Sequence, residues 1–197
     1  MLGSLLGPLN GTMIVLALRS IADEFGISVG GATWLITAYL VGTASLNTLG
    51  GKIGDRYGRR PVMFGALIAF ALLSLGAALA PSFPVLLSFR VGQAVAITLV
   101  APNGMALLRE VVPVERRASR FGLMAGGMAL SAAAGPLVGG VLLAVADWRA
   151  LFYVNLPVIV AALALGWRAW PAAPPTIRPR PQLGGARPPL PVPRRAW

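Results

Sequence analysis

The stretch Gly51-Lys-Ile-Gly-Asp-Arg-Tyr-Gly-Arg-Arg60 places three glycines, one acid and four bases in ten consecutive residues. Two apolar runs flank it, residues 32–51 and 62–80, and neither contains a charged residue. Each run is long enough to cross a hydrocarbon core about 30 Å thick, because a helix rises about 1.5 Å per residue. The stretch therefore predicts a short charged connection between two membrane-spanning helices.

The composition of the 197-residue chain favours a membrane protein over a soluble one. Hydrophobic residues make up 56% of it and charged residues only 12%, too few to cover a soluble domain of this size. There is no Cys and no His, so we expect no enzyme, no metal site and no cofactor. The net charge of +11 does not indicate nucleic-acid binding, because most of the bases lie between apolar runs.

Six apolar runs of 17 residues or more predict an all-α membrane protein with six transmembrane helices. The runs are residues 2–18, 32–51, 62–80, 85–108, 121–146 and 150–167. The first is the shortest and contains Pro8, so an interfacial segment is an alternative for it. The connection at 147–149 is so short that the last two helices are expected to be antiparallel neighbours.

The distribution of Lys and Arg predicts the orientation. Fourteen of these bases follow the second, fourth and sixth runs, whereas only Arg19 and Arg149 lie on the opposite side. Because cytoplasmic segments are enriched in Lys and Arg, both termini are expected in the cytoplasm of a multi-pass cell-membrane protein.

The composition changes after Trp170. Residues 171–197 contain nine prolines and five arginines and show almost no apolar periodicity. A segment of this kind is expected to be disordered, because it cannot form a packed core. The chain is therefore divided into a six-helix transmembrane domain, residues 1–170, and a Pro/Arg-rich tail, residues 171–197.

Five segments resemble motifs of the major facilitator superfamily. The loop at 51–60 resembles the G-x-x-G-D-R-x-G-R-R signature between the second and third helices of that family. Residues 9–18 resemble the L-D-x-T-I-V-N-V-A-L-P run of drug:proton antiporters, with Asn10 at the acid. The other matches are 90–93 with R-x-x-Q, 131–140 with G-x-x-x-G-P-x-x-G-G, and 148–157 with W-R-x-x-F-x-x-N-x-P.

This resemblance is nearest to the fourteen-helix multidrug-efflux group and implies the N-terminal half of such a transporter. It implies export of a drug-like small molecule across the bilayer by alternating access, together with a second six-helix half. The tail is then expected to be a central loop ended by truncation or a shifted frame. The alternative function is a non-transporting membrane interaction protein that pairs with itself or with a separate half.

The resemblance also implies a conformational latch in the charged loop. Its residues are Gly51, Gly54, Asp55, Arg56, Gly58, Arg59 and Arg60. The glycines are expected to form a tight hairpin, and Asp55 to meet either a helix N-terminus or the Arg59 guanidinium. The alternative is that the bases only fix the topology.

Asn10, Arg90 and Gln93 are candidates for substrate binding or coupling. Arg90 is expected either to face a central cavity and pair with groups such as Gln93, or to extend to the outer headgroups. With Asn10 in the first helix, all six acids lie at or beyond the membrane boundaries. A proton-coupled transporter would then carry its proton elsewhere.

The fifth run contains a candidate hinge at Gly135, Pro136, Gly139 and Gly140. Pro136 removes one backbone donor and bends the helix, while the small residues around it allow another helix to pack closely. The alternative interpretations are a sealed helix interface and ordinary small-residue packing.

Overall fold

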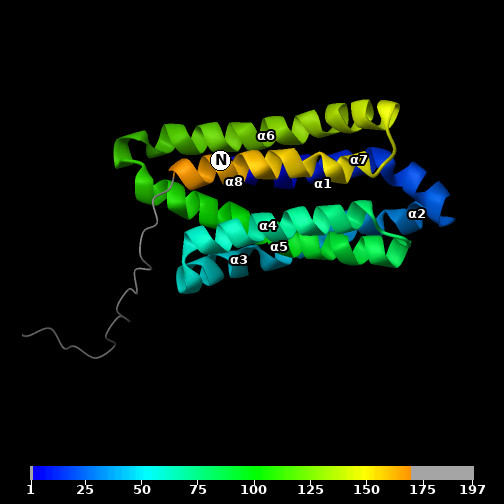
Figure 1. The fold of residues 1–197 in the computed structure, drawn as a ribbon. Helices are drawn as coiled ribbons and strands as arrows, with labels where there is room; N and C mark the ends of the chain where they lie inside the picture. Colours follow the sequence, from blue (N-terminus) through cyan, green and yellow to red (C-terminus); the bar gives the residue numbers. More distant parts are fainter. Residues whose placement is uncertain (1, 170–197) are drawn as a thin grey trace, which may run out of the picture.

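A computed structural model describes residues 2–169, in which the regular elements are all α-helices (Figure 1). The predicted tail, residues 171–197, lies outside the described residues. The helices are α1 Leu2–Phe25, α2 Val29–Ala32, α3 Trp34–Tyr57, α4 Arg59–Ala78, α5 Phe83–Val111, α6 Val114–Val145, α7 Ala150–Tyr153 and α8 Asn155–Ala169.

Six helical segments within the described range are long and apolar enough to cross a membrane. The second combines α2 with α3 over Val29–Tyr57, and the sixth combines α7 with α8 over Ala150–Arg168. The prediction of a six-helix, all-α membrane protein is confirmed. Several helices are longer than the apolar runs, because their terminal turns contain charged residues that reach water.

The first helix is an integral part of the bundle. Its span, Gly3–Phe25, has 23 residues and packs against α3, α5, α6 and α8. The side chains of Leu6, Ala17 and Ile21 are completely buried. The alternative of an interfacial segment is therefore wrong, and α1 continues past the apolar run through the exposed Arg19.

Close helix packing depends on small residues. A Cβ atom added to Gly42 of α3 would lie 2.9 Å from the Cβ of Ala94 in α5. Around these contacts the interior forms two large apolar clusters, one containing Phe70 and the other Trp148 and Phe152. In a bilayer, where lipid is as apolar as Leu, such packing is a main source of helix association.

The fifth and sixth spans pack less on each other than the short connection suggested. The helix α6 packs extensively along α1, whereas α8 packs against α1 and α4. The two spans run in opposite directions but contact each other mainly beside their connection, where α6 meets α7, so the prediction that they pack as neighbours is wrong. A short connection fixes the direction of a span, while side-chain packing decides its partner.

One end of the bundle, here called the Trp148 end, is closed by a polar contact between α1 and the α6–α7 connection. Glu24 accepts hydrogen bonds from Trp148 Nε1 at 2.6 Å and from both terminal nitrogens of Arg149, at 2.6 and 3.0 Å. The indole of Trp148 is buried against Phe25 and Phe152. The hydrogen bond to Glu24 is the main reason that the pKa of Arg149 is raised.

We expect Glu24→Gln to lower the free energy of unfolding by about 1 kcal/mol, because the variant loses a charge-assisted bidentate contact that is partly exposed to solvent. Thermal unfolding in detergent micelles, followed by tryptophan fluorescence, measures the effect. Asp23→Asn is the matched control, since Asp23 is the exposed acid next to Glu24. Equal melting temperatures for the two variants would contradict a stabilising role for Glu24.

Candidate functional site

The charged loop is shorter than the sequence suggested. The helix α3 continues to Tyr57 and α4 begins at Arg59, so Gly58 alone lies between them. Its φ of 93° is in the region that favours glycine, whereas Gly51 and Gly54 are helical. The predicted three-glycine hairpin is therefore wrong. Pro61 lies in the first turn of α4, where its missing N–H removes no helical bond.

The glycines before the loop bring α3 against α5. A Cβ atom on Gly54 would overlap the side-chain oxygen of Asn103, and one on Gly50 would overlap the backbone oxygen of Thr98. Asn103 Nδ2 also donates to the Gly50 carbonyl at 3.0 Å. No atom lies within 4 Å of a Cβ built on Gly51. Sequence reasoning missed Gly50 and Asn103, although an Asn in an apolar run was a signal.

Arg59 joins the loop to the end of α5; this end of the bundle is here called the Arg59 end. The Arg59 guanidinium binds Asp55 Oδ1 and Glu110 Oε1, each at 2.8 Å. The Asp55–Arg59 contact is one of the two alternatives predicted for Asp55, and Glu110 is an additional partner of Arg59. Asp55 and Arg59 therefore connect three consecutive helices, α3, α4 and α5.

Two other bases of the loop, Arg56 and Arg60, contact aromatic rings. Arg56 lies over the ring of Tyr57, 5.5 Å from its centroid. Arg60 lies between Phe64 and Trp167, 5.6 and 5.2 Å from their centroids, and donates to the Trp167 carbonyl at 3.4 Å. Arg60 thus attaches the start of α4 to the end of α8, away from the Arg59 ion pairs.

We expect Arg59→Ala to change the free energy of unfolding by less than about 1 kcal/mol. Its partners Asp55 and Glu110 have side chains that are 62% and 53% exposed, and solvent screens such pairs strongly. The measurement is thermal unfolding in micelles, with Arg56→Ala as the control. A loss above about 2 kcal/mol would mean that the ion pairs hold the fold together, not merely the relative positions of helix ends.

Arg90 lies inside the bundle. It is 1% exposed, so the alternative in which it extends to the headgroups is wrong. Its guanidinium donates to Asn10 Oδ1, to the Asn10 carbonyl at 3.0 Å and to Gln93 Oε1 at 3.0 Å. It also lies 4.4 Å from the ring centroid of Tyr39. The three candidates Asn10, Arg90 and Gln93 are thus in one cluster that joins α1 and α5.

The cluster continues across the bundle through neutral side chains. Gln93 Nε2 donates to Ser74 Oγ at 2.7 Å, and Asn155 Nδ2 approaches the same oxygen at 3.4 Å. All three side chains are completely buried. Interior polar groups therefore connect α5, α4 and α8, and Ser74 and Asn155 are members that sequence reasoning did not select.

Gly135 and Gly139 place α6 directly on α1. A Cβ atom on Gly135 would overlap the Thr12 hydroxyl, and one on Gly139 would lie 3.2 Å from the Met13 carbonyl. Pro136 cannot donate to the Ala132 carbonyl, which instead lies 3.1 Å from Thr12 Oγ1. The helix is continuous through Pro136. Gly140 has a looser contact, 3.9 Å from Leu16, so the tight interface is centred on Gly135.

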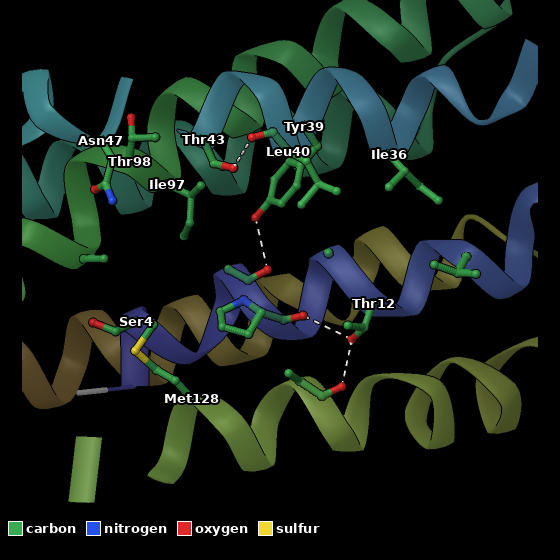
Figure 2. A pocket seen from close by; sticks show the side chains of 16 residues that line it. Ser4, Thr12, Ile36, Tyr39, Leu40, Thr43, Asn47, Ile97, Thr98 and Met128 are labelled. Carbon is green, nitrogen blue, oxygen red and sulfur yellow. Dashed lines mark hydrogen bonds between the residues drawn. The ribbon is translucent and has the colours of Figure 1, made fainter. Parts of the chain in front are cut away.

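A cavity of about 460 Å³ opens between α1, α3, α5 and α6 (Figure 2). It is lined by Ser4, Gly7, Pro8, Gly11, Thr12, Val15, Ile36, Tyr39, Leu40, Thr43, Asn47, Ile97, Thr98, Ala101, Met128 and Ala132. None of these residues is charged, and Arg90, Asn10 and Gln93 are not among them. Arg90 therefore does not line this cavity, whereas Tyr39 does, and its ring centroid lies 4.4 Å from the guanidinium.

The sequence matches known proteins along most of its length. A family model described as Major Facilitator Superfamily matches residues 1–197. YvkA, an uncharacterized MFS-type transporter of Bacillus subtilis, is 38% identical over 163 residues, which are 83% of this chain and 37% of that protein. The puromycin resistance protein pur8 of Streptomyces alboniger is 37% identical over 171 residues, covering 85% and 33%.

A third relative is the methylenomycin A resistance protein of Bacillus subtilis, 32% identical over 168 residues, which are 85% of this chain and 36% of that protein. The chain thus spans about a third of the length of these curated relatives. Among solved structures, the proton:xylose symporter XylE aligns with a TM-score of 0.73 at 18% identity. That alignment covers 85% of this chain and 42% of the symporter, and the likeness concerns the fold alone.

Proposed function

The chain belongs to the major facilitator superfamily, and we propose that it forms the N-terminal six-helix half of a transporter that exports drug-like small molecules. Relatives whose names record resistance to methylenomycin A and puromycin support export. The motif resemblance to the fourteen-helix antiporters supports the same branch. In this proposal, the cavity wall is completed by a second half, and the two halves expose it alternately to each side of the membrane.

The observation that carries the proposal is the uncharged cavity between α1, α3, α5 and α6 (Figure 2). Apolar side chains such as Ile36, Leu40 and Ile97 line it together with a few hydroxyl groups. A concave apolar surface with few polar groups suits small, largely apolar molecules. In a membrane protein, such a hollow on one face of six packed helices fits one wall of a transport pathway.

The latch is proposed to operate at the Arg59 end. Its ion pairs are exposed and cost little to break, so they suit an interaction that forms in one access state and opens in the other. The Lys and Arg distribution supports a cytoplasmic location for this end. The division into a membrane domain, residues 1–170, and a tail, residues 171–197, remains part of the proposal, as does a hinge at Pro136.

A chimera tests the function. The aligned residues of this chain replace the matching segment of the methylenomycin A resistance protein. Growth of a sensitive host that expresses the chimera is then measured at increasing concentrations of methylenomycin A. We expect the chimera to confer resistance and an Asp55→Asn, Arg59→Ala chimera to lose most of it.

Residues 1–197 expressed alone should confer no resistance, because they supply one wall of the cavity. A chimera that reaches the membrane but gives no resistance would contradict the proposal. Resistance from residues 1–197 alone would contradict the requirement for a second half.

A further inference from the structure

The hydroxyl groups on the cavity wall donate their hydrogens to the backbone (Figure 2). Thr43 Oγ1 donates to the Leu40 carbonyl at 2.9 Å, and Tyr39 Oη donates to the Gly7 carbonyl at 3.1 Å. Thr98 Oγ1 donates within its own helix, α5, at 2.6 Å. Each oxygen keeps lone pairs but has no hydrogen left to offer.

The Thr12 hydroxyl also has no free hydrogen to donate to a ligand, for a different reason. This hydroxyl has three carbonyl oxygens within 3.2 Å, those of Pro8, Leu9 and Ala132. Pro136 leaves the Ala132 carbonyl without its helical donor, so the single Thr12 hydrogen is held between α1 and α6. The middle of the cavity, at Thr12, Tyr39 and Thr43, is therefore a surface of hydrogen-bond acceptors.

Ser4 and Asn47 are the exceptions. Within the described residues neither side chain makes a hydrogen bond, and both lie where the cavity approaches the Arg59 end (Figure 2). They give that end of the cavity both donors and acceptors. Around Thr12, Tyr39 and Thr43, in the middle of the wall, the polar side chains thus offer acceptors alone.

The electrostatic environment disfavours charged ligands. The lining contains no acid to bind a cation, and the Arg90 guanidinium lies behind Tyr39, 4.4 Å from its ring centroid. All the partners of Arg90 in the described structure are neutral. An anion would also find no charged donor on the wall, because the guanidinium is buried and already hydrogen-bonded.

We propose that this wall selects uncharged, largely apolar molecules that donate hydrogen bonds, through a hydroxyl or an N–H group, to the acceptor surface around Thr43. The inference rests on the proposed function for its identification of the cavity as a substrate site. Thr43 is a specificity-determining residue here, since its oxygen is the more accessible acceptor beside the buried Tyr39.

Four naphthalene derivatives of similar size test the selection: 2-naphthol, 2-methoxynaphthalene, 2-naphthoate and 2-naphthylmethylammonium. The chain is placed in lipid nanodiscs, and binding is measured by equilibrium dialysis, with empty nanodiscs subtracted to remove partitioning into lipid. We expect naphthol to bind about five- to tenfold more tightly than its methyl ether, which lacks the donor hydrogen. Both ions should bind more weakly than naphthol.

Thr43→Val removes the acceptor and keeps the shape of the side chain, so it should reduce the preference for naphthol to about twofold or less. Thr37→Val is the matched control, because Thr37 lies on the same helix, makes a similar bond to the Thr33 carbonyl and does not line the cavity. This control should retain the full preference.

Each other outcome overturns the inference. The inference is contradicted if naphthol and its ether bind equally, if an ion binds more tightly than naphthol, or if no probe shows saturable binding. It is also contradicted if Thr43→Val and Thr37→Val lose the preference for naphthol to the same extent. The binding measurement is independent of the resistance assay. A donor preference without resistance in the chimera would reject the transport proposal alone, while resistance without a donor preference would reject only this selectivity.

Discussion

Replacement of Gly50 by Ala is expected to destabilise the chain by about 3 kcal/mol or more. The new Cβ atom would overlap the Thr98 carbonyl oxygen and lie 3.2 Å from Pro102 Cγ. Both obstacles belong to a helix backbone or a rigid ring, so no side-chain rotation relieves them. The α3–α5 contact must separate, and the hydrogen bond from Asn103 to the Gly50 carbonyl weakens with it.

Gly51→Ala provides the control for this substitution. The two glycines are adjacent in α3, but nothing lies within 4 Å of a Cβ atom on Gly51. Since Ala is the better helix former, Gly51→Ala should be neutral or stabilising by up to about 1 kcal/mol. Thermal unfolding in micelles and the yield of folded protein compare the pair. Similar behaviour of the two variants would show that α3 and α5 are not in such close contact.

The sequence predicted the membrane spans well because each depends on a local property. Charged residues interrupt the apolar runs, and a run of about 20 apolar residues has few alternatives to a membrane helix. The same reasoning failed within the loop at 51–60, where glycines and charges suggested a hairpin although α3 continues to Tyr57. A helix that leaves the membrane can continue in water, so hydropathy does not determine where it ends.

Contacts between helices were predicted less well. In a continuous apolar run every face is hydrophobic, so the pattern does not reveal which residues face another helix. Gly50 and Gly51 are indistinguishable in the sequence, yet only Gly50 contacts α5. The Glu110 partner of Arg59 lies 51 positions away, and no local spacing indicates it.

Three helices around the cavity contain an internal proline. Pro8, Pro102 and Pro136 lie inside α1, α5 and α6. Each lacks the N–H that would bond the carbonyl four residues earlier, which belongs to Ser4, Thr98 and Ala132 respectively. All three of those residues line the cavity. Each of these helices thus lacks one backbone hydrogen bond beside the cavity, and a freed carbonyl there accepts another contact, as Ala132 does from Thr12.

Replacement of Arg90 by Met is expected to lower the free energy of unfolding by about 2–4 kcal/mol, which is the second large effect. Two contributions oppose each other. Removing a buried cation is favourable in itself, because the desolvation of that charge is no longer required. However, Asn10 Oδ1 and Gln93 Oε1 then lose their donor inside the bundle, and each unsatisfied buried acceptor costs about 1–3 kcal/mol. The backbone carbonyls of Asn10 and Leu35, which also accept hydrogen bonds from Arg90, lose less, because they belong to helices.

Asn10→Asp separates these contributions in a double-mutant cycle. With Arg90 present, the new carboxylate meets a guanidinium that already donates to position 10, so stability should be unchanged or higher. With Met at position 90, the same carboxylate is buried without a partner and should cost several kcal/mol more than Arg90→Met alone. The coupling between the two positions should therefore exceed about 2 kcal/mol.

Thermal unfolding of the four proteins in micelles gives this coupling, and Arg19→Met controls for loss of a base from an exposed position. Additive effects at positions 10 and 90 would show that Asn10 and Arg90 do not interact in the folded protein. A coupling of the expected size would show that Arg90 interacts directly with the side chain at position 10. In the native chain, the amide and carbonyl oxygens of Asn10 then take the place of a carboxylate beside the buried Arg90. The α1–α5 contact would then be independent of protonation at position 10, since Asn does not titrate.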